Sequence, residues 1–230
     1  MIFAAATTVT LGANTLSTGD ASSTSYAGAI SGVGGALTKQ GSGSFTLTGA
    51  NTYTGATTVS AGSLVLAGGS AIANTGAVNL STSGANLTLS ASETSGSLTG
   101  VAGTTVTLGA NTLSTGDASN TSYAGVIGGA GGGLTKQGSG SFTLAGANTY
   151  TGATTVSVGS LVLSGGSAIA NTSAVNLSTS GADLTLSAAE TIGSLTGVAG
   201  TTVTLGANML STGDASSTSY AGAISGVGGA

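Results

Sequence analysis

The amino-acid sequence predicts an all-β protein with the architecture of a parallel β-helix, or β-solenoid. Two observations support this prediction. A block of 97 residues recurs along the chain without insertion or deletion. Within each block, short segments that alternate apolar and small polar residues return at intervals of about twenty residues. Such a nested repeat is typical of proteins that stack one supersecondary unit on the next.

The long repeat begins at Thr7, Thr104 and Thr201, where the sequence reads TTVTLG each time. Aligning residues 7–103 with 104–200 leaves twelve differences. Because the sequence stops within a third copy, we expect it to be a segment of a longer chain. We expect one solenoid over residues 1–230, divided into an atypical start at 1–6, a first repeat at 7–103, a second at 104–200 and a partial third at 201–230.

The short period sets the expected number of coils. Four-residue strands are predicted at 8–11, 44–47, 63–66 and 86–89, and the segment 26–30 divides the longest interval between them. This spacing predicts five coils per 97-residue repeat, each of about 19.4 residues, and about twelve coils in the whole chain. A rise of about 4.8 Å per coil then predicts a rod of about 57 Å.

Alternation along each strand predicts which side chains enter the core, because successive residues of a strand point to opposite faces. Thr10, Thr46 and Thr88 should point outward. Frequent β-branched residues and glycines disfavour helix, and the glycines suit tight corners. The inward residues should be Val9, Leu11, Phe45, Leu47, Leu64, Leu66, Leu87 and Leu89, with their copies 97 residues later.

Composition limits the classes of partner and of chemistry. The chain has two lysines, six acidic residues and no Arg, His, Cys, Pro or Trp. Two lysines cannot form the basic surface that nucleic acid requires, so we expect no nucleic-acid partner. Positive mean hydropathy (+0.45) with a net charge of only −4 argues against disorder. No disulfide framework is possible, and the apolar runs are too short for a transmembrane helix.

No catalytic, cofactor-binding or metal-binding residue is predicted. Without His or Cys, neither a Ser–His or Cys–His nucleophile nor a zinc site can form. Asp20 is a candidate calcium ligand, but a turn residue bonded to local backbone is the favoured interpretation. Asp183 and Glu190 are a candidate carboxylate pair for glycoside chemistry. We expect both to be solvated instead, since Asn86 replaces Asp183 in the first copy.

Three further pairs of polar residues recur at matching positions. Lys39 and Lys136 are expected to point outward as solubilising charges, which also discourage sideways aggregation. Tyr53 and Tyr150 are expected at half-buried corners with their hydroxyls in water, in preference to a row that stacks on sugars. Asn51 and Asn148 are expected in structural ladders along the solenoid axis.

The segments that carry these pairs resemble a known family. Residues 35–59 read GALTKQGSGSFTLTGANTYTGATTV, and the copy begins at Gly132. This pattern, closed by SLVL at 63–66 and 160–163, resembles the autotransporter-associated β-strand repeat, also called the passenger-associated transport repeat. Phe45 and Phe142 stand where the family usually has Leu. The resemblance implies a right-handed parallel β-helix in a secreted passenger, an outer-membrane β-barrel on the same polypeptide, and a Gram-negative cell surface.

The expected function is therefore structural, not enzymatic: a surface-exposed stalk or adhesin scaffold that supports passenger secretion and folding, with an unidentified host or surface ligand. An alternative is an ice- or surface-binding solenoid, if the threonines of 8–10, 105–107 and 202–204 face outward together. A less favoured alternative is a polysaccharide-active enzyme. Cut ends and low net charge also predict end-to-end self-association, which Lys or Pro within 202–205 should suppress.

Overall fold

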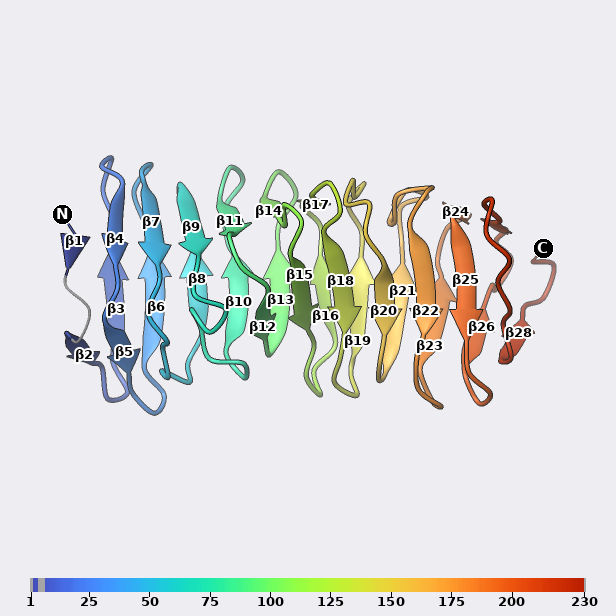
Figure 1. Cartoon of the computed structure of the whole chain (residues 1–230), viewed down its shortest axis with the longest axis horizontal. Helices are drawn as coiled ribbons and strands as arrows, with labels where there is room; N and C mark the ends of the chain where they lie inside the picture. The colour runs from blue at the N-terminus through green and yellow to red at the C-terminus, as the bar shows by residue number, and fades with distance from the viewer. Residues whose placement is uncertain (1, 4–6, 230) are drawn as a thin grey trace.

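The computed structural model describes residues 2–3 and 7–229. It shows an all-β parallel solenoid of about ten turns, drawn out as a rod with the two termini at opposite ends (Figure 1). Every strand pairing among the described residues is parallel, because each coil returns the chain to the same side in the same direction. Of the predicted atypical start, residues 1 and 4–6 lie outside the described part.

The described residues form 28 strands in five sheets. The eleven-stranded sheet contains β3 (Thr15–Thr18), β6 (Ala36–Lys39), β8 (Thr57–Val59), β10 (Ala77–Leu80), β13 (Ser97–Gly100), β16 (Thr121–Tyr123), β19 (Ser141–Leu144), β21 (Ser160–Leu163), β23 (Asp183–Leu186), β26 (Thr202–Thr204) and β28 (Ala223–Ser225). The seven-stranded sheet contains β1 (Ile2–Phe3), β4 (Thr24–Tyr26), β7 (Ser44–Leu47), β9 (Ser63–Leu66), β11 (Asn86–Leu89), β14 (Thr105–Thr107) and β17 (Val126–Gly128).

The third large sheet has six strands: β12 (Glu93–Ser95), β15 (Thr112–Thr115), β18 (Gly133–Lys136), β20 (Thr154–Val156), β22 (Ala174–Leu177) and β25 (Ser194–Gly197). Two short sheets complete the fold, β2 (Thr8–Thr10) with β5 (Ala29–Ser31), and β24 (Glu190–Ile192) with β27 (Leu210–Thr212).

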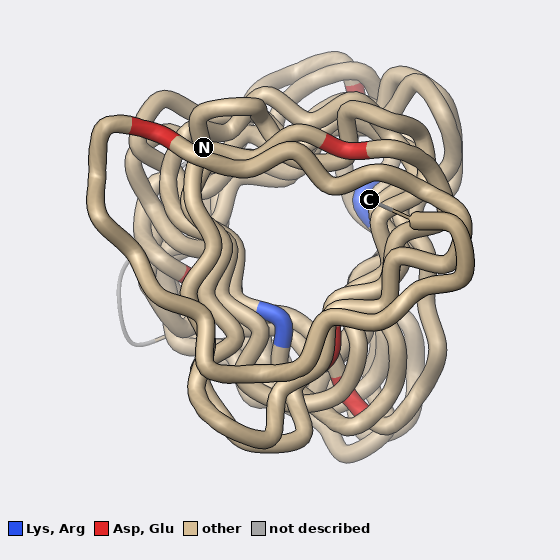
Figure 2. The backbone as a smooth tube through the Cα atoms, turned by 90° about the vertical axis from the view of Figure 1, so that its right-hand side faces the viewer, with Lys and Arg blue, Asp and Glu red and all other residues tan. Residues whose placement is uncertain are grey.

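These sheets make three faces. Face 2 is the eleven-stranded sheet, face 1 is the seven-stranded sheet followed by β24 and β27, and face 3 is β2 and β5 followed by the six-stranded sheet. Two segments without strand, 51–53 and 70–72, lie between β5 and β12 on face 3 and form the first gap. Residues 148–150 and 167–169 lie between β17 and β24 on face 1 and form the second gap. Seen along the rod, the backbone is a tube with three walls (Figure 2).

The 97-residue repeat does not make a whole number of coils. Each strand or gap segment forms one side of a coil, and a complete coil has three sides, one on each face. The repeat contains twelve strands, β2 to β13, and the two segments of the first gap, so its fourteen sides make four and two-thirds coils. Copies of one strand therefore lie on different faces: β6 belongs to the eleven-stranded sheet, and its copy β18 to the six-stranded one. The prediction of five coils per repeat does not agree with this topology. Paired residues lie 19 to 23 positions apart, for example Phe45 with Leu64 and Leu64 with Leu87.

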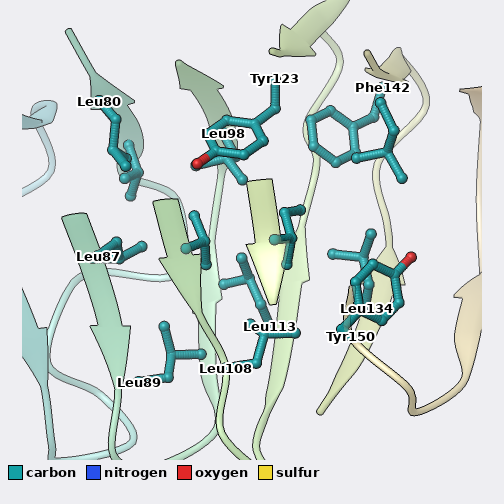
Figure 3. Packing of buried hydrophobic residues seen from close by; sticks show 14 of the residues in the cluster. Leu80, Leu87, Leu89, Leu98, Leu108, Leu113, Tyr123, Leu134, Phe142 and Tyr150 are labelled. Carbon is teal, nitrogen blue, oxygen red and sulfur yellow. The ribbon is translucent and has the colours of Figure 1, made fainter. Parts of the chain in front are cut away.

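The predicted core positions are confirmed. In most four-residue strands two alternate side chains enter a single continuous core, and the row Phe45, Leu64, Leu87, Val106, Ile127 runs in register along face 1. Figure 3 shows such side chains from successive coils converging on the same interior. Val9 is the exception, because it lies in the first described coil and remains partly exposed. Thr10, Thr46 and Thr88 lie on the outer surface, where Thr10 is exposed and the other two are half-buried.

Candidate functional site

Buried polar side chains gather in two equivalent places of the solenoid. Lys39, Asn51, Tyr53 and Thr57 are all 4% exposed or less, and so are their copies Lys136, Asn148, Tyr150 and Thr154. Glu93 and Glu190 approach the same places from later coils and are 2% and 3% exposed. In each set the asparagine, tyrosine and glutamate lie at a gap, whereas the lysine ends a strand, β6 or β18, and bonds to the corner that follows it.

The lysines point inward, so the prediction of outward solubilising charges is wrong. The Nζ of Lys39 donates to the carbonyl oxygens of Gln40 at 2.8 Å, Gly41 at 2.8 Å and Ala61 at 3.1 Å. All three donors of the ammonium group are thus satisfied by backbone, and the third bond joins two successive coils. Burial lowers the pKa of Lys39, while the charge of Asp20 opposes this effect.

The second lysine repeats this geometry. Lys136 donates to Gln137 and Gly138 at 2.7 Å and to Val158 at 3.1 Å, and burial lowers its pKa to about 8, against the effect of Asp117. The two-residue period of the strand indicates the inward orientation of Lys39, because Lys39 lies two residues after the inward Leu37 and so shares its face. The chain also makes room for the stem: a Cβ added at Gly19 would lie 3.2 Å from the Cδ of Lys39 and 2.1 Å from the carbonyl oxygen of Gln40.

Asn51 bridges the first gap with its side chain. Its Oδ1 accepts from the backbone N–H of Ile30 at 2.6 Å, and its Nδ2 donates to the carbonyl oxygen of Ala71 at 2.7 Å. The amide therefore bonds to the coil before and the coil after, as strand backbone would. Asn148 does the same between Ile127 and Ala168, at 2.7 Å each. The predicted structural role is confirmed, although each amide bonds to backbone and not to another asparagine of a ladder.

The tyrosines are fully buried, so the prediction of half-buried corners with wet hydroxyls is wrong. The hydroxyl of Tyr53 is 2.7 Å from Oγ1 of Thr57, and that of Tyr150 is 2.7 Å from Oγ1 of Thr154. Both rings are 0% exposed, which leaves no face available for stacking on a sugar. Burial raises the pKa of Tyr53 to about 12 and also raises that of Tyr150.

Glu93 meets the same gap from the other side. Its Oε2 accepts from the backbone N–H of Ala71 at 2.9 Å, while its Oε1 is buried with no hydrogen-bond partner among the described residues. In the second gap, Glu190 accepts from Ala168 at 3.0 Å and from Ile169 at 3.3 Å. The sequence does not predict that these glutamates accept backbone hydrogen bonds in the core, because a single glutamate in a Ser/Thr-rich segment is expected to lie in solvent.

The structure does not bring together the candidate carboxylate pair for glycoside chemistry, Asp183 and Glu190. Asp183 begins β23 on face 2, where its side chain is half-buried, whereas Glu190 is buried on β24 of face 1. The prediction that Glu190 is solvated is wrong, because its carboxylate bonds to backbone amides in the core. The two carboxyl groups therefore do not face each other across a common site, as cleavage of a glycosidic bond would require.

Asp20 has the turn role that was predicted. Its Oδ1 accepts from the backbone N–H of Ser22 at 2.7 Å, and Asp117 and Asp214 make the same bond with Ser119 and Ser216. Among the residues that the structure describes, no three His, Cys, Asp or Glu side chains lie close enough to hold a metal ion.

A cavity of about 500 Å³ opens at the N-terminal end of the core. Threonines and apolar side chains line it, with Tyr26 as its titratable residue. It is thus the exposed end of the stacked core and lacks acid, base or cation side chains. In the described part of the chain there is also no α-helix that has the length and hydrophobicity to cross a bilayer.

Comparison with known families identifies the segments that hold these buried groups. The family model of the passenger-associated-transport-repeat matches residues 37–66 and again 134–163. These segments contain the buried lysine, asparagine and tyrosine of each group, but neither glutamate. No curated protein and no solved structure gave a significant match.

Proposed function

Because this chain carries two passenger-associated-transport repeats, as autotransporter passengers do, we propose that it is a structural, non-catalytic segment of a surface-exposed passenger. In this proposal it acts as a stalk or adhesin scaffold on a Gram-negative cell, supports secretion and folding of the passenger, and winds right-handed as the family resemblance implies. An outer-membrane β-barrel on the same polypeptide and an unidentified surface ligand belong to the same proposal.

One observation carries the structural role. Face 2 is a single ladder of eleven strands that runs along the rod, and each coil buries its apolar residues against the next. Stability in such a stack comes from neighbouring coils, so length is gained by adding repeats without changing the coil. The buried lysine and asparagine bonds in the matched segments also join coils, which is a role in holding the stack.

Surface exposure is tested with an epitope inserted between Ser83 and Gly84, an exposed turn in the first repeat. The gene in its native host should give antibody labelling of intact cells. A matched insertion between Ser180 and Gly181 in the second repeat controls for local effects. Labelling of both insertions only after permeabilisation of the cells would reject the proposal.

Binding to ice or another regular surface stays a second candidate, on a different row of residues from the one expected. The threonines of β2, β14 and β26 lie on three separate sheets, so they do not form one surface. Face 2 instead aligns one outward side chain from each of its strands, and ten of the eleven are Ser, Thr or Asn. The row is Ser17, Thr38, Thr58, Asn79, Thr99, Ser122, Thr143, Val162, Thr185, Thr204 and Ser225.

This row presents hydroxyl and amide groups about 4.8 Å apart, the spacing of neighbouring strands. Thermal hysteresis of the purified protein tests the candidate. The variant Thr143→Lys should abolish any activity, because it places a bulky charge in the middle of the row. Absence of hysteresis in the wild-type protein would remove ice as the surface.

A further inference from the structure

The two gaps are places where the backbone ladder is replaced by side chains. On face 3 the strand pairing stops after β5 and resumes at β12, and on face 1 it stops after β17 and resumes at β24. Some backbone bonds persist across the first gap, from Thr52 N–H to the oxygen of Ile30 at 2.8 Å and from Asn51 N–H to that of Ser70 at 3.1 Å. An asparagine and a glutamate supply further bonds to the backbone of each gap.

At each gap, one asparagine and one glutamate bond to the same short segment from opposite sides. Ala71 donates its N–H to Glu93 and accepts from the amide of Asn51. Ala168 is held in the same way by Glu190 and Asn148. The two side chains of a pair are 42 positions apart in both copies, so the segments 70–72 and 167–169 depend on residues that lie in two other coils.

The glutamate is the costly half of this arrangement. An ionised carboxylate in a protein interior loses its hydration and requires strong partners to compensate. Glu93 has one amide N–H at 2.9 Å for one oxygen, and its second oxygen is buried without a partner among the described residues. Burial accordingly raises the pKa of both glutamates, against the opposing effect of the backbone amides.

The titratable groups that face the glutamates are the tyrosines of the same gaps. Tyr53 faces Glu93 and Tyr150 faces Glu190, and each tyrosine is bonded to a threonine and fully buried. Both stay neutral through the ordinary pH range, because their pKa is raised. They supply no positive charge to compensate an ionised glutamate.

A short path connects the held segment to water. In the first gap, residues 68–70 and 74–75 are exposed, while Ala71 and Ile72 between them are buried. Movement of this loop alone would let water reach the carboxylate, without separating the coils on faces 1 and 2. Local openings of this kind have lower free energy than global unfolding.

We propose that Asn51 with Glu93, and Asn148 with Glu190, form proton-operated clasps that hold the two gaps of the solenoid. With the carboxyl group protonated, the gap is closed and carries no buried charge. Ionisation as the pH rises favours release of segments 70–72 and 167–169, because the released carboxylate regains its hydration. The three faces therefore differ: face 2 stays paired, while faces 1 and 3 each contain one site that loosens with pH.

Hydrogen exchange measured by mass spectrometry tests the clasps. The population of open segment 70–72 in the wild-type protein, corrected for intrinsic exchange rates, should rise between pH 4.5 and 7.5. The rise approaches tenfold per pH unit from the ordinary glutamate pKa up to the folded-state pKa, and then levels off. The double variant Glu93→Gln/Glu190→Gln should show no such rise, since a neutral amide replaces the carboxyl group.

Two controls make the outcomes decisive. Segment 87–89 of β11, which is paired on both sides, should keep constant protection over the same range. The variant Asp20→Asn/Asp117→Asn, which changes one exposed and one half-buried turn carboxylate, should keep the wild-type response. An equal rise in the glutamine variant would overturn the proposal. If that variant does not fold, a constant protection ratio between 70–72 and 87–89 in the wild-type protein overturns it as well.

Discussion

The ammonium group of Lys136 lies 3.1 Å from the carbonyl oxygen of Val158, one coil further along the solenoid. Two more carbonyl oxygens, from Gln137 and Gly138, complete its set of acceptors. A side chain that is usually found in water is thus part of the bonding between coils. The charge of Lys136 changes with pH near its lowered pKa of about 8, where unfolding can be measured.

Stability should increase between pH 7.5 and 9.5. The folded-state pKa of Lys136 is lowered to about 8, below the 10.5 of the unfolded chain, so protonation favours the unfolded state. Raising the pH from about 8 toward 10.5 removes this penalty, and Lys39 shifts in the same direction. Urea unfolding at both pH values measures the effect. The variant Lys39→Met/Lys136→Met should lack the increase, and an equal increase in it would contradict the assignment.

Stability should also increase as the pH falls from 7 to 4.5. The folded-state pKa of Glu93 and of Glu190 is raised, so their contribution is fully present below the unfolded value of 4.5 and is lost as the pH rises through the folded-state value. Asp214 acts in the opposite sense only below about its ordinary 3.8, outside this range. Thermal unfolding across the range measures the trend. A midpoint that falls steadily toward pH 4.5 would show that these glutamates do not govern acid stability.

Truncation inside and outside the core should separate the two faces of a strand. Leu87 is 1% exposed and lies between Leu64 and Val106 of the neighbouring coils. Leu87→Ala should lower the free energy of unfolding by about 2–5 kcal/mol, as truncations of buried leucines do. Thr88→Ala, one residue on, should change it by less than about 0.5 kcal/mol. Equal effects in urea unfolding would place the wrong side chains in the core.

Spin labels should reveal the fractional coil count. Ser83 and Ser180 are copies, but they lie at different corners, since Ser83 follows β10 of face 2 and Ser180 follows β22 of face 3. Ser187 follows β23 of face 2 and so lies at the corner of Ser83, five coils along. The pair Ser83→Cys/Ser180→Cys should therefore be further apart than Ser83→Cys/Ser187→Cys, although its axial separation is smaller, about 22 Å against about 24 Å. The reverse order in electron–electron distance measurements would favour a whole number of coils.

We propose that the isolated chain associates end to end. Ile224 of β28 is 55% exposed, whereas its copies Ile30 and Ile127 are 1% and 0% exposed because a following coil covers them. Strand β26 is already paired on both sides, so the expectation that changes in 202–205 suppress association does not fit the structure. Ile224→Lys on the edge strand β28 should suppress it instead. Sedimentation showing a monomer at high micromolar concentration for the wild-type protein would contradict the proposal.

The strand period carried most of what could be predicted. Alternation identifies the inward leucines, and it also places Lys39 on the inward face, two residues after Leu37, although the charge of a lysine favours the outer surface. The coil count could not be predicted as easily, because corner lengths vary and paired residues are 19 to 23 positions apart. The gaps have no strand pattern of their own. Their closure by Glu93 depends on contacts between residues 22 positions apart, which one coil's sequence does not show.

The fractional coil count has a consequence for how such genes change. Nearly identical tandem repeats are suited to unequal recombination, which deletes or inserts whole units. Loss of one 97-residue unit would leave every coil intact and yet turn all that follows by a third of a revolution about the rod, because fourteen sides are not divisible by the three faces. Loss or gain of three units leaves the orientation of the following coils unchanged, because three units contain a whole number of coils. Recombination in multiples of three would therefore change only the reach of whatever the rod carries, while any other number would also change the direction in which it faces.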